Sequence, residues 1–533
     1  MSSRISSAGP AVRSTGAAAP KPRPTEAEKL DKQPIRTWTA SGPTPLRGKG
    51  VRDAALPAMG DFKGVTNQQL VAALSKADTT RLLELKAGKT KPAALVTPED
   101  GSAKVKAFHM AALGADQTGI EFPLQMAKIG EAEGFRLVLR IPAGMEKDFQ
   151  KELAKEKLDN VTLVPVKDSE ELDFWSEDQG ELHVDGSVSV PRSLKGSKEL
   201  SQEELLKAIT KDRLERLHPD AKVDLSTTDK LWAARKKYPE VAYANVGAVG
   251  ERGGQRAIAA IALGGKKDLR VSNGYIEGGN ALVGRRADGT GFAVVGADSI
   301  SASKAALSKE LGKALSEDDV RTLVAQDYGV DVKQLVVVEQ PGDFHIDMHV
   351  TLLPNGKALV NDAATVFALQ KQWLTEDLER TKPTPPPAGA SKAAVARYND
   401  EKELWDIRKE GLPNRLKELE AHARRAGAAE ARTVKDLEAA GISVERMPGV
   451  FPPAGDALPR MNFMNSEKGL NHKGEPFVVA LGGDPRAEKL VAQALSKAAG
   501  TSVRVHFLDR RLTETTLNAG GGISCRTKIE AES

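Results

Sequence analysis

The chain has 533 residues, of which 40% are hydrophobic and 4% aromatic, and its net charge is only +4. This near balance of charge, without a dense block of Lys and Arg, does not favour a nucleic-acid-binding protein. No apolar run approaches the roughly 18 residues needed to cross a bilayer, and the first residues lack the apolar core of a secretory signal. We therefore expect a cytoplasmic protein without nucleic-acid or membrane partners, although export by a non-classical route would leave no such mark.

The sequence contains a single cysteine, Cys525. One cysteine excludes an intrachain disulfide framework and any metal site built from several thiolates. Its thiol is therefore either a packing group or a reactive group, and its neighbours in the sequence have to decide between the two.

Residues 1–62 are rich in Ala, Ser, Pro, Gly, Lys and Arg and have no sustained hydrophobic period. Such a composition cannot bury enough apolar surface to offset the entropy of ordering, so we expect this region to be disordered. A helical pattern over residues 65–86 follows, within a lead-in of residues 63–90. The remainder, residues 91–533, forms the main domain.

From about residue 92 the chain alternates β-branched runs with amphipathic stretches, which indicates an α/β fold. The runs come in pairs ahead of each helix, which is not the strict alternation of a doubly wound sheet. Ser316 and Asp319 have the spacing of a capping box. Expected strands include FRLVLRIP, VTLVPV, RAIAAIAL, NALVG, GFAVVG, QLVVVEQP and PFVVALGG, and expected helices cover residues 122–133, 146–157, 303–315 and 317–328.

A Pro-rich break at residues 382–390 leads into a charged helical stretch over residues 393–426. Apolar residues are sparse in this stretch, so we expect an insertion that faces solvent, near residues 382–426. The α/β pattern returns after it.

Four short segments place a carboxylate, an imidazole or a thiol beside glycine or on a strand-like pattern: residues 173–180, 276–280, 344–350 and 518–527. Taken singly, Asp178 is more typical of a turn residue and Glu277 of a carboxylate in a loop. The segment FHIDMHV reads as a strand with His345 and Asp347 on one face. That face could be the polar side of a half-buried strand, or a metal site completed by His349.

The segment around Cys525 is the most informative of the four. Gly520, Gly521 and Gly522 allow the backbone to approach a ligand closely. Arg526 follows the cysteine, and a positive charge nearby favours the reactive thiolate. A cysteine that serves only for packing is more typical of an apolar run, so this pattern favours a catalytic role.

In this order, the four segments resemble the motifs of the guanidino-group-modifying superfamily, which contains agmatine, arginine and peptidylarginine deiminases and the amidinotransferases. Residues 175–180 resemble W-x-x-D-x-G, residues 277–279 E-G-G, residues 345–347 H-x-D and residues 520–527 G-G-G-x-x-C-x-T. A fifth segment, MNFMN at 461–465 followed by FVVALGGDPRAEKL, resembles the N-F stretch of agmatine deiminases. Two residues depart from the family pattern: Ser524 replaces the usual His, and Asn280 replaces the Asp of arginine deiminases.

The resemblance implies a five-bladed α/β propeller, the pentein fold, built of pseudo-repeated ββαβ units around a central site. It implies that Cys525 attacks the guanidinium carbon and that His345 transfers protons. Asp178 and Asp347 would hold the guanidinium, and Glu277 would orient His345 or share the charge. Trp175 and Asn280 would be further substrate-binding residues, and no metal or organic cofactor would be needed.

The expected function is that of a deiminase, which hydrolyses the guanidinium of an arginine-type substrate to a ureido product and ammonia. Peptidylarginine or agmatine is favoured over free arginine, because the W-x-x-D-x-G and N-F elements match those families. Two alternatives remain: an amidinotransferase with the same residues, and an inactive family member that only binds arginine-rich partners. The sequence does not indicate an oligomeric state.

Overall fold

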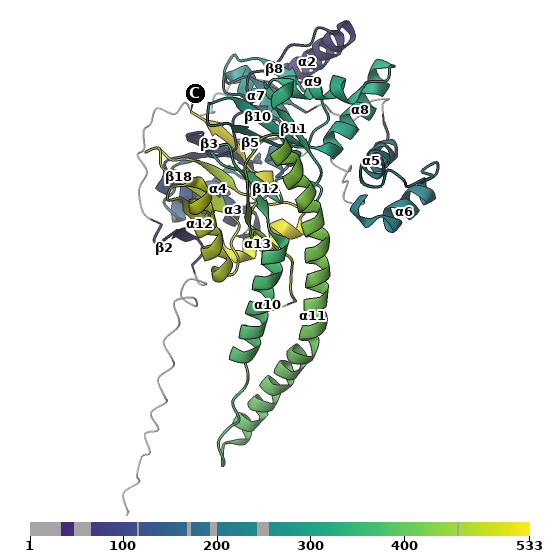
Figure 1. Ribbon diagram of the computed structural model, residues 1–533. Helices are drawn as coiled ribbons and strands as arrows, with labels where there is room; N and C mark the ends of the chain where they lie inside the picture. Colours follow the sequence, from purple (N-terminus) through teal and green to yellow (C-terminus); the bar gives the residue numbers. More distant parts are fainter. Residues whose placement is uncertain are drawn as a thin grey trace, which may run out of the picture.

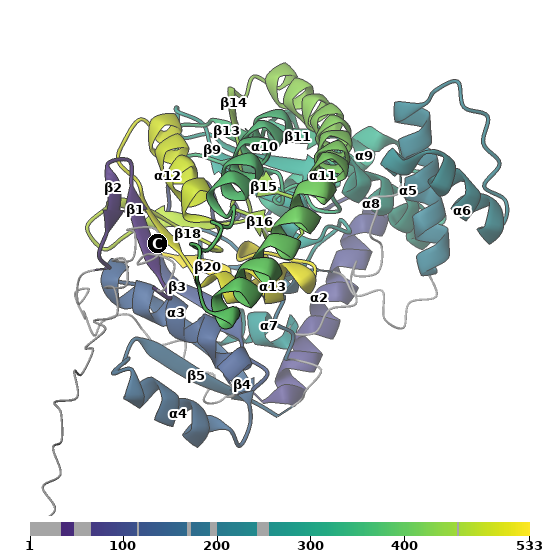
Figure 2. The same cartoon turned by 90° about the horizontal axis from the view of Figure 1, so that it is seen from below.

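The computed structural model describes residues 33–46, 66–114, 117–167, 172–191, 200–241, 255–455 and 458–532. The fold is a mixed α/β arrangement in which helices surround several small sheets (Figures 1 and 2). The lead-in helix is confirmed as α2 (Asn67–Ala87), with a capping box at Thr66. Its C-terminus is closed by Gly88 in the left-handed conformation, as is common at helix ends.

Five of the sheets in the described part of the chain repeat one pattern of strands. Two antiparallel strands are followed by one or more helices and then by a strand parallel to the second of the pair. The first two units in the chain are β6 (Glu181–Leu182), β7 (Val188–Val190), α5 (Gln202–Leu217), α6 (Thr228–Lys237), α7 (Gln255–Gly264) and β8 (Leu269–Val271), then β9 (Ala281–Arg285), β10 (Gly291–Gly296), α8 (Ala297–Leu311), α9 (Glu317–Tyr328) and β11 (Leu335–Val338).

The other units follow the same order, except that one joins the two ends of the chain. They are β12 (Val350–Leu352), β13 (Ala358–Asn361), α10 (Ala363–Arg380), α11 (Lys392–Ala439) and β14 (Val444–Met447), then β17 (Glu467–Leu470), β18 (Pro476–Ala480), α12 (Pro485–Ala499) and β19 (Arg504–Phe507). In the last, β20 (Lys528–Ala531) pairs with β3 (Val105–Ala111), and α3 (Gln117–Glu133), β4 (Arg136–Pro142), α4 (Glu146–Lys155) and β5 (Val161–Val166) follow.

The segments that carry the sequence motifs all lie directly before the first strand of a unit. Two short 3₁₀ helices, η3 (Ser176–Gln179) and η5 (Gly278–Asn280), precede β6 and β9, and the turn at residues 345–349 precedes β12. The segment 463–466 precedes β17, and η7 (Ser524–Arg526) precedes β20. The three 3₁₀ helices contact one another, so the repeat brings together motifs that lie far apart in the sequence.

An N-terminal hairpin contradicts part of the expected disorder. Strand β1 (Arg36–Thr39) pairs with β2 (Gly42–Thr44) and, on its other side, with β19. Arg36 donates two hydrogen bonds from Nε to the carboxylate of Glu488, at 2.9 and 3.1 Å, and Trp38 donates to the same group. The expectation was wrong for residues 33–46 because their partners lie some 450 residues away. The rest of residues 1–62 lies outside the described residues.

Three further expectations are corrected by the structure. RAIAAIAL forms the helix α7 instead of a strand, since its alanines favour a helix. FHIDMHV is a turn that leads into β12 rather than a strand, so its side chains do not alternate between two faces. The helix expected at 303–315 is α8, which begins earlier and is capped by Gly296. The helix expected over 317–328 is confirmed as α9, with the capping box of Ser316 and Asp319.

The helical stretch expected at 393–426 lies in α11, which together with α10 forms a long pair of helices that projects from the body (Figure 1). Helix α11 continues to Ala439, well beyond residue 426, and packs beside α10. Its distal part is charged and largely exposed, as the sequence predicts. Among the described helices, none is both long and apolar enough to cross a membrane.

The buried pair of Arg36 and Glu488 leads to the first prediction. Arg36→Met should lower the free energy of unfolding by about 3–5 kcal/mol, because it leaves a buried carboxylate without its cationic partner. Unfolding in urea measures this loss. Arg511→Met is the matched control, since Arg511 forms an exposed pair with Asp509 and its loss should not be measurable. Equal effects of the two variants would contradict the anchoring role of β1.

Candidate active site

His345 and Glu277 form a buried pair at the centre of the site. His345 donates from Nε2 to Oε2 of Glu277 over 2.6 Å, the arrangement expected if Glu277 orients the imidazole. Burial alone would lower the pKa of His345, but the charge and hydrogen bond of Glu277 outweigh it and raise that pKa to about 9. The imidazole therefore carries two protons at neutral pH and can act as a proton donor.

Asp347 and Cys525 lie against this pair. A ring nitrogen of His345, a carboxylate oxygen of Asp347 and the sulfur of Cys525 all lie within 4.8 Å of one another, although Cys525 comes from a different unit than His345 and Asp347. The sulfur of Cys525 is 3.9 Å from Oδ2 of Asp347, and Ser524 donates to the same oxygen over 2.8 Å. Burial raises the pKa of Asp347 to about 7, even though the charge of His345 opposes the shift.

The surroundings of Cys525 favour its neutral thiol over the thiolate. Burial, and after it the negative charges of Asp347 and Glu177, raise the pKa of this thiol well above its usual range. The sequence had suggested that Arg526 would favour the thiolate, and this was wrong. The guanidinium of Arg526 instead stacks over the ring of Phe122, 4.1 Å from its centroid, and burial lowers its own pKa to about 10.

Asp178 and Trp175 reach the same centre from η3 and the residue before it. Oδ1 of Asp178 accepts a hydrogen bond from the backbone N–H of Gly278 over 3.0 Å, which links η3 to η5. The ring of Trp175 lies against Gly521, where a Cβ atom would come within 2.2 Å of the indole. The glycine run before the cysteine is therefore required for close approach.

Gly279 and Asn280 hold η5 in place against His345. A Cβ atom on Gly279 would lie 2.4 Å from Nδ1 of His345 and 3.0 Å from Oδ1 of Asp347, so only glycine fits there. Both of those ring and carboxylate atoms are buried without a hydrogen-bond partner among the described residues. The amide of Asn280 bonds to Gln340 and to Ser299. Its predicted contact with substrate stays a prediction.

Two residues that the sequence analysis did not assign belong to this site. Asn465 donates from Nδ2 to the sulfur of Cys525 over 3.3 Å. The sequence feature that could have indicated Asn465 is the MNFMN segment, in which it is the last residue. Glu177 precedes Asp178, is buried, and has one carboxylate oxygen without a hydrogen-bond partner in the described structure. A carboxylate beside Asp178 was visible in the sequence, but its burial was not.

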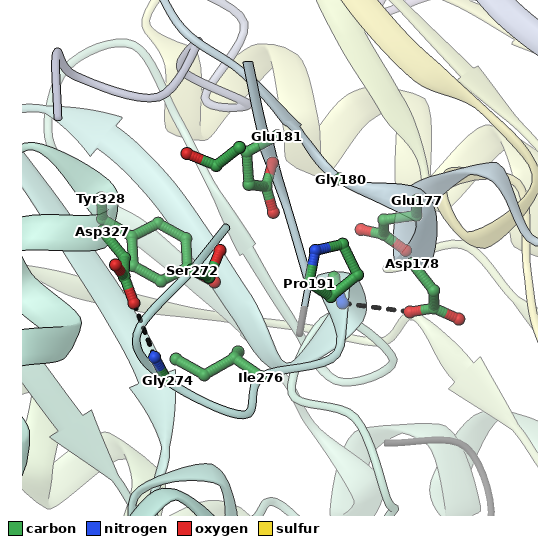
Figure 3. Close-up of a pocket in the computed structure, with 12 residues that line it drawn as sticks. Glu177, Asp178, Gly180, Glu181, Pro191, Ser272, Gly274, Ile276, Asp327 and Tyr328 are labelled. Atoms are coloured by element: carbon green, nitrogen blue, oxygen red, sulfur yellow. Dashed lines mark hydrogen bonds between the residues drawn. The ribbon is translucent and has the colours of Figure 1, made fainter. Parts of the chain in front are cut away.

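An acidic cavity opens beside Asp178. Figure 3 shows Glu177 and Asp178 on one side of it and Asp327 and Tyr328 on the other, with Glu181 between them. Burial, reinforced by neighbouring carboxylates, raises the pKa of Glu177 well above its ordinary value, and burial raises that of Asp327 to about 6. A cation entering this cavity would favour ionisation of these groups, and they would in turn stabilise the cation.

The structure does not bring together the three residues of the metal site that the sequence suggested, His345, Asp347 and His349. His349 does not join His345 and Asp347, because its ring nitrogens lie 3.9 Å from Asp343 and 3.5 Å from Glu430. In the described part of the chain, the set whose geometry could hold a metal ion is His345, Asp347 and Cys525. These are the same three residues to which the resemblance assigns proton transfer, guanidinium binding and attack.

Comparisons with known proteins add little to this geometry. No family model and no curated protein matches the sequence. Among solved structures, one described as a "putative agmatine deiminase" is similar, with 12% sequence identity and a TM-score of 0.41. The alignment covers 83% of this chain and all of the other. A similarity of this size carries no argument about function, so the interpretation rests on the residues of the site.

The pair of His345 and Glu277 generates a prediction about pH. Glu277→Gln should lower the pKa of His345 from about 9, because the burial that opposes the charged form remains. The pKa of His345 is about 9 in the folded protein and 6.5 in the unfolded chain. The pair with Glu277 therefore adds stability that is fully present below pH 6.5 and is lost as the pH rises through 9. The difference in unfolding free energy between wild type and variant should therefore be largest below pH 6.5 and shrink above pH 9.

Titration of histidine carbons by NMR measures the pKa directly, and unfolding at several pH values measures the stability. Glu240→Gln is the control, because Glu240 pairs with His218 near the surface and should leave the signal of His345 unchanged. An unshifted His345 in the Glu277 variant would contradict the assignment.

Proposed function

We propose that this protein is a cysteine-dependent deiminase that acts on the guanidinium of an arginine-type substrate. The observation that carries the proposal is the meeting of His345, Asp347 and Cys525 within 4.8 Å in a buried, acidic site. Asp178 and Glu277 are tied to the same centre. The repeated ββαβ units, each with a site segment before its first strand, support a five-bladed propeller of the pentein type.

Carboxylates are the groups best suited to hold the substrate. A guanidinium is planar and cationic, and paired charge-assisted hydrogen bonds hold it flat. Asp178 and Asp347 take this role, and Trp175 and Asn280 are the further candidates for substrate contact. Because burial keeps the pKa of Asp347 near 7, arrival of the cation stabilises the ionised carboxylate and binding becomes stronger as the pH rises through that value.

The reaction proceeds in two steps through Cys525. The bound cation offsets the negative field around the thiol, whose proton leaves to solvent, and the thiolate forms a C–S bond to the guanidinium carbon. The imidazolium of His345 donates its proton as one C–N bond breaks, which releases ammonia. His345 then takes a proton from water as the water attacks the same carbon. The C–S bond then breaks, which restores the thiolate, and the remaining hydroxyl proton passes to solvent as the neutral ureido product leaves.

The cavity beside Asp178 favours peptidylarginine or agmatine over free arginine. Among the residues that the structure describes, its lining contains Glu177, Glu181 and Asp327 and no Lys or Arg that could bind an α-carboxylate. An amidinotransferase would use the same residues, and it would require an acceptor amine where the deiminase uses water. An inactive arginine-binding protein would need the same cradle but would release no ammonia.

The first test is product formation. We expect the pure protein to release ammonia and a ureido product from agmatine or a blocked arginine peptide, without an acceptor amine and with less turnover of free arginine. Cys525→Ser should reduce this turnover by several orders of magnitude, because a hydroxyl is a far weaker nucleophile than a thiolate at neutral pH. Asp347→Asn should raise the substrate KM as well, because it removes one charge from the cation site. Ammonia release by the serine variant at the wild-type rate would refute the mechanism.

The acidic site also predicts which reagents modify the cysteine. The cationic 2-chloroacetamidine should alkylate native Cys525 at least about tenfold faster than the neutral 2-chloroacetamide, since one favourable charge contact of ~1.4 kcal/mol gives that ratio. Because Cys525 is the sole cysteine, mass spectrometry of the intact protein reports it alone. The same comparison in denaturant supplies the intrinsic ratio of the two reagents. A native ratio no higher than the denatured ratio would exclude a cation-binding site at the thiol.

A further inference from the structure

The unit that contains β17 places an amide where the other units place reactive groups. Segment 463–466 precedes β17 as η3, η5 and η7 precede their strands, and it contributes Asn465 to the centre of the site. Asn465 is completely buried. The fold therefore positions this side chain in the same way as Asp178, Glu277 and Cys525.

The orientation of the Asn465 amide is set by the backbone. Its Oδ1 accepts a hydrogen bond from the N–H of Ser524 over 2.9 Å. Since the oxygen is used in this way, the NH₂ group must point to the opposite side of the amide. There Nδ2 donates to the sulfur of Cys525 over 3.3 Å and to Oδ2 of Asp347. A rotated amide would lose its bonds to all three neighbours.

A second asparagine fixes the turn that carries this amide. Asn462 donates from Nδ2 to the carbonyl of Met348, the residue after Asp347, over 3.0 Å. Its Oδ1 accepts from the backbone N–H groups of Met464 and Asn465. A Cβ atom on Gly522 would come within 2.2 Å of the amide oxygen of Asn465, so glycine is what lets the cysteine loop approach.

We propose that Asn465 is the side-chain hydrogen-bond donor that stabilises the Cys525 thiolate and holds the sulfur in register with Asp347. The other side chain bonded to the sulfur among the described residues is Asp347, an acceptor when ionised, which cannot stabilise a thiolate. The backbone N–H of Gly522 acts in the same direction as the amide. The inference rests on the proposed function only in taking Cys525 as the nucleophile.

The test is the pH dependence of Cys525 alkylation by iodoacetamide, a neutral reagent, in the full-length protein. Asn465→Ala should raise the apparent pKa of the thiol by about one unit, which is a tenfold lower alkylation rate at a fixed pH below that pKa. Asn465→Asp should raise it further, because it replaces the donor with a negative charge. In the alanine variant we expect kcat to fall more than KM rises, since the amide contacts the nucleophile and not the substrate.

Asn471→Ala is the matched control. Asn471 is also a buried amide near β17, but it donates to Glu133 and not to the cysteine, so its loss should leave the alkylation profile unchanged. Circular dichroism and urea unfolding confirm that each variant is folded. If Asn465→Ala does not fold, Asn465→Asp carries the test, because it keeps the volume and the acceptor for the N–H of Ser524.

A folded Asn465 variant with the wild-type alkylation profile would overturn the proposal. Alkylation requires no turnover, so this result is distinct from failure of the proposed function. A protein that never releases ammonia but shows the shifted profile would retain the role of Asn465 at the thiol and lose only the deiminase assignment.

Discussion

The placement of a buried thiol among buried carboxyl groups is the constraint on which the rest of the site depends. In a poorly solvated interior, like charges repel strongly, and a thiolate beside Asp347 and Glu177 would add to that repulsion. The site relieves it by keeping protons on the sulfur and by raising the pKa of both carboxyl groups. A bound cation would relieve it in another way, and under the proposed function a guanidinium would thereby favour both the thiolate and the ionised carboxylates.

The fold supplies the balancing charges at fixed positions. Lys528, at the start of β20 and three residues after the cysteine, pairs with Glu181 and lies 3.6 Å from Glu99. Thr527, which lies between Cys525 and Lys528 in the sequence, donates a hydrogen bond to Glu467 on β17. These bonds tie the cysteine loop to two neighbouring units. The acidic site is therefore held by the same contacts that hold the units together, which explains how so many buried carboxyl groups are tolerated in one place.

Much of the site could be predicted from the sequence because its residues lie in short glycine-containing segments with recognisable spacing. His345, Asp347 and Cys525 were identified in this way, and the pairing of Glu277 with His345 was anticipated. What could not be predicted depends on partners distant in the sequence. The N-terminal hairpin is ordered by Glu488, and Arg526 turns away from the cysteine because Phe122 offers it an aromatic face. The strand predicted at FHIDMHV was wrong for a related reason. The segment is a turn, and its apolar side chains Ile346 and Met348 pack into two different parts of the core.

The most direct measurement of the central claim is the mass of the Cys525 peptide after incubation of His345→Ala with substrate. Without the imidazole, ammonia leaves more slowly because its proton must come from solvent. Water is also not activated, so an adduct that has lost ammonia should persist. The account predicts a mass increase equal to the substrate less ammonia, confined to the peptide that contains Cys525 and absent in the double variant with Cys525→Ser. Undiminished turnover by His345→Ala, or an adduct on another residue, would contradict it.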